Sequence, residues 1–346
     1  MFKKILAAVL CLMMIFAVGC KNDNVVYEDL SNYDEAQGDT QQAQTDLKIN
    51  PLTGVKDVTA AAAARRPVAI VVNNTTEAQG VQTGLNQADV IFESEVEGGI
   101  TRLLAVYQDI TDLDKVGTVR SARYHFVEIA LGLDAVYCHC GQNTYAKNLL
   151  DQTDHLSIET NKFGGERIKN GTSATEHTLY VNAAPLWSSI SQKFDTKASG
   201  NKTFANFAPS DETVTLNGGT ATSVKVPFPI KDTDFVYDGA TGLYTRLSDG
   251  KQLKDYFTGE ETQVKNVFIL LTSKTYFEDN KTPRMILEGG EGYYITNGTV
   301  QNIKWSKGSS KNGFSFTDES GNALTVNAGN SWVCIANKQT CTPTIK

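Results

Sequence analysis

The sequence predicts a layered α/β or α+β domain followed by a mostly β domain, and two patterns predict it. In the first half, apolar runs typical of buried strands alternate with stretches of helical periodicity. The strands are expected at 68–72, 90–96, 100–107 and 135–140, and the helices at 122–131, 146–150 and 185–190. In the second half, short runs rich in Val, Ile, Phe and Tyr are separated by turn residues. The change of pattern predicts a first domain over 65–212 and a second over 220–346.

The turn residues of the second half are pairs that favour β-hairpins, because Asn and Gly readily adopt positive backbone angles. They are Asn217-Gly218, Asp238-Gly239, Asp249-Gly250, Asn297-Gly298 and Asn312-Gly313. The clearest strands between and after them are expected at 266–271, 292–295, 301–305 and 331–335.

The amino terminus predicts export and a lipid anchor. Lys3 and Lys4 precede an apolar run over 5–18, which is shorter than the ~20 residues that a transmembrane helix needs. The run ends at Ala17-Val18-Gly19-Cys20, which resembles a bacterial lipobox. We therefore expect a signal peptide over 1–19, lipidation of Cys20, and a protein held on the extracytoplasmic face of the cell membrane.

Residues 20–64 are polar and acidic at first and end in an alanine run, so a disordered tether is expected there. The whole chain carries 32 Lys and Arg against 39 Asp and Glu, a formal net charge of −7. A chain that is acidic overall is a poor partner for a polyanion, and we therefore expect no nucleic acid.

The stretch around the expected 90–107 hairpin concentrates charge in an otherwise apolar region. Glu93, Glu95 and Glu97 fall on one face of the first strand by alternation, Gly98-Gly99 suits the turn, and Arg102 lies in the returning strand. A loop then leads to Arg120 and Arg123, with Ser121 as the expected cap of the following helix. Arginines at a helix amino terminus require an anion nearby, since that end of the helix carries a partial positive charge.

Two partners for these arginines remain open. Glu93 and Glu97 can pair with Arg102 and Arg123 inside the fold, or an external phosphate or carboxylate can lie between the guanidinium groups. Polar residues expected to lie at strand ends or in loops complete the candidate ligand-binding set: Asn73, Asn74, Asp89, His139, Arg167 and His177.

Cysteine usage predicts no metal site. Cys138 and Cys140 flank His139 without the Cys-x-x-Cys spacing of zinc sites, and both are interpreted as small buried apolar residues. Cys334 and Cys341 close a short loop, so a disulfide between them is left open.

Several strings together resemble the YerB-like lipoproteins of Gram-positive bacteria, a two-part family of unknown function. The most specific are Glu97-Gly98-Gly99-Ile100-Thr101-Arg102 and Val119-Arg120-Ser121-Ala122-Arg123. Others are Val71-Val72-Asn73-Asn74, Gln82-Thr83-Gly84-Leu85, Ala88-Asp89, Asp134-Ala135, Tyr244-Thr245-Arg246 and Ile303-Lys304-Trp305. The resemblance covers nearly everything after the tether, and it implies no particular activity.

Two functions of different classes follow from these residues. The first is a binding or accessory protein of the cell envelope, which contacts an envelope protein or an anionic cell-wall component and needs no cofactor. The second rests on a faint resemblance to the LytR-CpsA-Psr phosphotransferases, which act on lipid-pyrophosphate-linked glycopolymer. That alternative implies Mg²⁺ held by Asp89, with Arg102, Arg120 and Arg123 on pyrophosphate. The chain departs from those enzymes in having only Arg167 where they carry paired arginines.

Overall fold

A sheet of eleven strands runs through both halves of the chain in the computed structural model, which describes residues 46–153, 155–200 and 202–346. The expected signal peptide, the lipidation site Cys20 and the first part of the expected tether lie outside the described residues. In spatial order the sheet contains β12 (Gly219–Thr220), β22 (Thr299–Ser306), β21 (Gly289–Thr296), β18 (Asn266–Thr272), β25 (Ser331–Asn337), β4 (Val90–Glu95), β5 (Thr101–Tyr107), β3 (Val68–Asn73), β7 (Val136–His139) and β8 (Ser157–Glu159), with β23 (Ser315–Thr317) also on β22.

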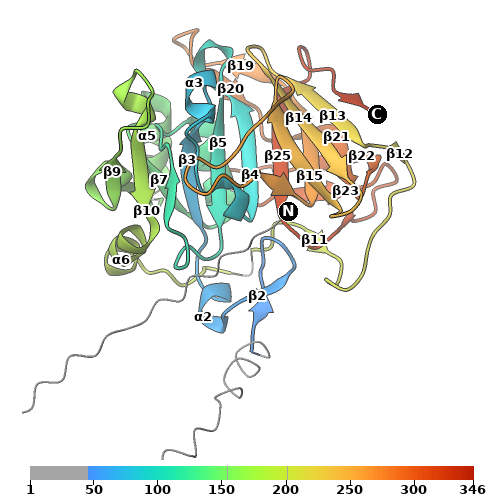
Figure 1. The fold of residues 1–346 in the computed structure, drawn as a ribbon, viewed down its shortest axis with the longest axis horizontal. Helices are drawn as coiled ribbons and strands as arrows, with labels where there is room; N and C mark the ends of the chain where they lie inside the picture. Colours follow the sequence, from blue (N-terminus) through green and yellow to red (C-terminus); the bar gives the residue numbers. More distant parts are fainter. Residues whose placement is uncertain (1–45, 154, 201) are drawn as a thin grey trace, which may run out of the picture. The chain divides into compact units, whose positions relative to one another are not determined.

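The two halves meet where β25 pairs in parallel with β4 (Figure 1). Ser331 lies opposite Val90 and Ile335 opposite Ser94 in this pairing. Both strands are wholly buried, which is typical of parallel strands inside a layered fold. The mixed first half and the β-rich second half therefore share one continuous sheet.

Two smaller sheets cover one face of the large sheet. Next to the second half lie β16 (Lys251–Gln252), β15 (Leu243–Ser248), β14 (Asp232–Asp238), β13 (Ser223–Pro227) and β26 (Thr344–Ile345), with β17 (Gln263–Val264) also on β15. Next to the first half lie β6 (Lys115–Gly117), β10 (Leu179–Asn182) and β9 (Gly165–Arg167). Three pairs of short strands, each strand two or three residues long, complete the list: β1 (Lys48–Ile49) with β2 (Lys56–Val58), β11 (Asn206–Phe207) with β24 (Thr325–Val326), and β19 (Lys274–Tyr276) with β20 (Pro283–Met285).

The helices belong mainly to the first half. They are α2 (Ala60–Ala63), α3 (Thr76–Gln79), α4 (Tyr124–Gly132), α5 (Thr144–Thr153) and α6 (Ala183–Lys193), with short 3₁₀ turns at Leu85–Gln87, Glu97–Gly99, Thr160–Lys162 and Thr175–His177. In the described part of the chain, none of the helices has both the length and the apolar character needed to span a bilayer.

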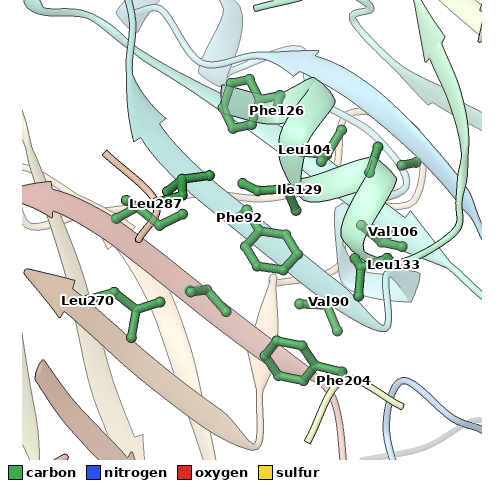
Figure 2. Packing of buried hydrophobic residues seen from close by; sticks show 14 of the residues in the cluster. Val90, Phe92, Leu104, Val106, Phe126, Ile129, Leu133, Phe204, Leu270 and Leu287 are labelled. Atoms are coloured by element: carbon green, nitrogen blue, oxygen red, sulfur yellow. The ribbon is translucent and has the colours of Figure 1, made fainter. Parts of the chain in front are cut away.

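Two apolar clusters fill the space on the two faces of the large sheet. On one face, Phe92 and Leu104 of the first half pack with Phe126 and Ile129 of α4 and with Leu270 of the second half (Figure 2). Phe204 joins them, with its ring 5.9 Å from that of Phe92 and 5.7 Å from that of Phe268. On the other face, residues of β10 and α6 and of the six-stranded sheet are buried against the same strands. Each cluster draws on both halves, so the core is shared as well as the sheet.

The strand and hairpin predictions are confirmed where they rest on local pattern. The 90–107 hairpin has Glu95 opposite Thr101, and Gly98 and Gly99 adopt φ of 72° and 76°. Asn297-Gly298 and Asp249-Gly250 likewise have positive φ, at the turns after β21 and β15.

We call the segment that carries Arg120 and Arg123 the arginine loop. The helix after it begins later than predicted, and Ser121 is not its cap. The first helical residue of α4 is Tyr124, and Arg123 precedes it without a side-chain capping hydrogen bond. The residues before it are held extended by neighbouring strands: the Arg120 N–H donates to the Val71 carbonyl at 2.9 Å and the Ala122 N–H to the Gly141 carbonyl at 2.9 Å. Because these bonds hold an extended backbone, helix cannot start at Ala122.

Folded structure also begins earlier than residue 65. Leu52 is fully buried, and the Asn50 amide donates to the Asp89 carboxylate at 2.9 Å. The stretch 46–64, predicted as part of a disordered tether, thus includes β1, β2 and α2 and packs on the start of β4. Val58 and Ala62 are buried as well, and the Gln108 side chain donates to the Ala62 carbonyl at 2.7 Å, so several contacts attach this stretch.

Candidate functional site

The arginine loop crosses the ends of two strands at one edge of the sheet. The Arg120 N–H donates to β3, and the Arg120 carbonyl accepts from the N–H of Cys140, the residue after β7, at 3.0 Å. Arg102 lies on β5 directly opposite Asn73 of β3. These pairings bring Arg102, Arg120 and Arg123 together, and we call the three residues the arginine cluster.

Arg102 is the most buried member of the arginine cluster, with 2% of its surface exposed. Its Nη1 donates to the Ser121 carbonyl at 2.7 Å. Burial lowers the pKa of Arg102 to about 9, and the charges of Arg123 and Arg120 lower it further than Glu97 raises it. A buried guanidinium whose close neighbours are mostly cations lies in an unfavourable field.

Arg123 has an internal carboxylate partner. Its Nε donates to Glu97 at 2.6 Å, and Asn143 donates to the other oxygen of Glu97 at 3.1 Å. Burial alone would raise the pKa of Glu97, but Arg123 and Arg102 hold it below its usual value. The internal-partner interpretation is therefore right for Glu97 and Arg123.

Arg120 forms an ion pair with Glu176, with 3.0 Å between Nη1 and the carboxylate. The same carboxylate lies 3.7 Å from Nε2 of His177, and Glu77 lies 3.4 Å from that nitrogen. The ring Nδ1 of His177 accepts a hydrogen bond from Asn73 at 2.7 Å. Both residues predicted for this set, Asn73 and His177, are thus linked to Arg120 through Glu176.

One member of the arginine cluster and one neighbouring side chain carry buried polar atoms without a protein partner in the described part of the chain. They are Nε of Arg120 and both ring nitrogens of His125. Burial lowers the pKa of His125 to about 3, and Arg123 and Arg102 contribute to the shift. Buried polar atoms are normally hydrogen-bonded, so atoms without a partner at this place favour a bound molecule.

Arg167 lies near the arginine cluster rather than in it. Its Nη1 donates to the Thr175 carbonyl at 2.6 Å. Burial raises the pKa of the Cys140 thiol, and the charges of Arg167 and Arg120 oppose that shift. Arg167 and Arg120 therefore flank the half-buried Cys140, which is less buried than the sequence predicted.

His139 has a different set of partners. Its Nδ1 donates to the Gly141 carbonyl at 2.8 Å, and Glu159 lies 3.9 Å away. His139 and Glu159 line a cavity of about 230 Å³ together with Ser157 and Lys162. Burial lowers the pKa of His139, and the hydrogen bond to the Gly141 carbonyl and the charge of Glu159 oppose that shift.

The three glutamates predicted on one face have three different partners. Glu95 pairs with Lys274 at 2.6 Å, Glu97 pairs with Arg123, and Glu93 faces the second half of the chain. Pairing of Glu93 with Arg102 is wrong, because Arg102 lies opposite Ser94, and neighbouring residues of a strand point to opposite faces.

Glu93 instead belongs to a buried network that joins the two halves. Its carboxylate accepts hydrogen bonds from Asn74 at 2.8 Å, Thr233 at 3.0 Å and Trp332 at 3.1 Å. Arg246 donates to Asn74 at 2.9 Å and to Gln82 at 3.2 Å. Lys231 donates to the Asn74 carbonyl. We call Asn74, Gln82, Glu93, Lys231, Thr233 and Arg246 the seam cluster, and Asn74 is thus a structural residue.

Asp89 is not brought to the arginines. It precedes β4, whereas the residue opposite Arg102 is Ser94, near the other end of that strand. Its carboxylate accepts from the Gln108 N–H at 2.6 Å and from Asn50, and burial raises its pKa to about 7. A shared magnesium and pyrophosphate site with Asp89 and the arginine cluster is therefore not supported by this geometry. Among the described residues, no group of three or more His, Cys, Asp or Glu side chains is arranged to hold a metal ion.

Sequence patterns missed His125, Asn143 and Arg246. His125 lies two residues after Arg123 in an apolar helix, and this placement was an available signal. Arg246 could not be found in this way, because it is 144 residues beyond Arg102 and reaches the first half only through tertiary packing. Cys334 and Cys341 are both buried free thiols in this structure.

Comparisons with known proteins agree with the two-part organisation. Residues 52–199 match the model for the N-terminal domain of DUF3048, described as a protein of unknown function, and residues 224–333 match its C-terminal domain. A Bacillus subtilis protein named as a putative lipoprotein, YerB, is 30% identical over 293 residues, which are 82% of this chain and 85% of that protein. The crystal structure of Bacillus subtilis YerB superposes with a TM-score of 0.72 at 27% identity, over 85% of this chain and 98% of the solved one.

Proposed function

The chain belongs to the DUF3048 family, whose members include a protein named as a putative lipoprotein, and we propose that it is an extracytoplasmic, lipid-anchored protein that binds an anion. The binding site is the arginine cluster. The anion is a phosphate or carboxylate group of an envelope component, either a cell-wall polymer or a partner protein.

The observation that carries this proposal is a shortage of negative charge. Three guanidinium groups converge, and two carboxylates bond to them: Glu97 to Arg123 and Glu176 to Arg120. Among the described residues, the side chain of Arg102 donates to the Ser121 carbonyl and not to a carboxylate. An arginine that is buried without a carboxylate is costly unless a ligand supplies the missing charge.

The site is reachable from outside through its two outer members. The Arg120 and Arg123 side chains keep 19% and 15% of their surfaces exposed, whereas Arg102 lies beneath them. The uncapped first turn of α4 adds main-chain N–H groups at the same place. Guanidinium groups and helix N–H groups together suit the oxygens of a phosphate or carboxylate.

The anchor is tested separately from the site. In cells fed radiolabelled palmitate, the wild type is expected to incorporate label and to fractionate with membranes, whereas Cys20→Ala should do neither, because Cys20 carries the acyl chains. Labelling of Cys20→Ala, or no labelling of the wild type, would show that the lipoprotein assignment is wrong.

The anion site is tested by thermal melting with and without pyrophosphate or inorganic phosphate. We expect a ligand-induced rise in melting temperature for the wild type, of the size produced by about 2.7 kcal/mol when the ligand is at 100 times its Kd. Arg102→Met should abolish the rise while leaving the unliganded stability within about 1 kcal/mol, because the substitution also removes repulsion from Arg120 and Arg123.

Glu97→Gln is the matched control, and it should change the response of the melting temperature to pyrophosphate in the opposite direction. It leaves Arg123 in place but removes an internal anion, so the response to pyrophosphate should increase. A wild type that does not respond to either anion, together with a strongly destabilised Arg102→Met, would contradict the proposal and make the arginine cluster a structural clamp.

A further inference from the structure

Strand β22 lies towards one end of the large sheet, and its outer edge is only partly paired (Figure 1). Thr299 and Val300 pair with β12, and Lys304 to Ser306 pair with β23. Within the described residues, nothing pairs with 301–303 on that side. The edge therefore has a gap of three residues between two short strands.

A cavity of about 710 Å³ lies at this gap. One wall comes from the β12 region through Gly218 and Gly219, and another from the turn after β23 through Asp318 and Glu319. Val300, Asn302 and Tyr293 line it from the large sheet, and β26 contributes Ile345. The volume is within the range of ordinary ligand sites, and an aromatic ring with a few polar groups is a typical lining.

The main-chain groups facing this cavity can be identified from the pleat. The Val300 carbonyl oxygen is directed at the β12 region, because a Cβ built on Gly218 would be 1.9 Å from it. Residues of an antiparallel strand direct their N–H and C=O alternately to the two neighbours. Asn302 therefore directs its own N–H and C=O into the gap. One residue of an added antiparallel strand could form hydrogen bonds with both groups.

Charge at the gap is set by the turn after β23. The Asn302 side-chain amide donates to the Glu319 carboxylate at 3.2 Å, and Glu319 is exposed. The neighbouring Asp318 carboxylate is already bonded to Asn322, at 2.8 Å and 2.9 Å. Lys346 also lines the cavity, so its charged lining is two carboxylates and one amine. The carboxylate closest to the Asn302 side chain is thus that of Glu319.

We propose that this gap binds an extended peptide, one residue of which exchanges both main-chain hydrogen bonds with Asn302 and carries a basic side chain. Residues directly opposite each other on paired strands place their side chains on the same face. The basic side chain would then lie beside the Asn302 amide and reach Glu319. Strand addition to an open sheet edge is an established mode of peptide recognition. This proposal uses no residue of the arginine cluster and stands independently of the anion site.

The test uses ¹⁵N-labelled full chain and the blocked tripeptide acetyl-Ala-Lys-Ala-amide as the probe. Addition should shift the Asn302 amide resonance and slow its hydrogen exchange at least tenfold, because an unpaired N–H becomes bonded. The same peptide methylated on the lysine main-chain nitrogen should lose the effect. Replacing its lysine by glutamate should weaken binding at least fivefold.

Glu319→Lys should weaken binding of the lysine peptide at least fivefold, and Glu278→Lys is its control, since Glu278 is an exposed acid in the β19–β20 turn. The proposal is overturned if Asn302 does not respond, or if the methylated peptide protects it equally. It is also overturned if N-acetylglucosamine perturbs the same amides as strongly as the peptide, because the gap would then be a saccharide site.

Discussion

The seam cluster and the arginine cluster each bury an arginine, and the surroundings of the two differ in sign. Arg246 in the seam cluster bonds to Asn74 and Gln82, its guanidinium lies 4.5 Å from the centre of the Trp332 ring, and Glu93 favours its charge. Arg102 in the arginine cluster has a carbonyl acceptor and two arginines as neighbours. The largest effect of a charged neighbour thus comes from a carboxylate for the first arginine and from two other arginines for the second.

This difference separates a structural charge from a binding charge. The seam cluster takes residues from both halves, so its hydrogen bonds hold β4 of the first half against the six-stranded sheet of the second. The arginine cluster and its carboxylates come from the first half alone. We infer that the network joining the two halves is needed for folding, and that the partly exposed network within the first half is available to a ligand.

The largest expected effect is the loss of the seam arginine. Arg246→Met would remove the guanidinium that favours the buried charge of Glu93 and that donates to Asn74 and Gln82, and we expect the free energy of unfolding to fall by about 3–5 kcal/mol. Denaturant unfolding followed by fluorescence and circular dichroism measures this value. The response of the arginine cluster to pyrophosphate should persist in the folded fraction.

The double variant Glu93→Gln/Arg246→Met is the control for that experiment. It removes both charges and keeps an amide that can accept from Trp332, so it should recover part of the lost stability. A single variant that loses under about 1 kcal/mol, or a double variant less stable than the single, would contradict the assignment of the seam cluster as a structural network in which Glu93 and Arg246 stabilise each other.

The dependence of stability on pH also distinguishes the clusters. Burial lowers the pKa of Lys231 in the seam cluster to about 7 and that of His125 beside the arginine cluster to about 3. For both bases the unfolded chain binds the proton more readily, so stability falls as pH falls from about 10.5 to 7 for Lys231 and from about 6.5 to 3 for His125.

Each window has a limiting slope of about 1.4 kcal/mol per pH unit. Lys231→Met should flatten only the upper window of a stability curve measured by chemical denaturation, and His125→Phe only the lower one. A His125→Phe curve that keeps the full acid slope would show that other groups cause it.

The sequence by itself determined the features that depend on local physics. Apolar runs predicted β3, β5, β7, β18 and β25 closely, and alternation predicted β4, because a strand buried on both faces is apolar throughout. Gly98-Gly99 predicted the tight turn between β4 and β5, since glycine adopts positive φ without strain. The grouping of Arg102, Arg120 and Arg123 was also predicted, because the hairpin and the following loop keep them near in sequence.

Only the tertiary structure decided which partner each charged side chain meets. Glu93 and Glu97 lie four residues apart, yet one joins the seam cluster and the other joins Arg123. Ser121 failed as a cap because β3 and β7 hold the loop extended, and Asp89 bonds to Asn50 rather than lying near the arginines. The pairing of β4 with β25 joins residues about 240 positions apart, as for Trp332 and Glu93 with a separation of 239. Contacts of that kind depend on how whole sheets pack, which no local periodicity encodes.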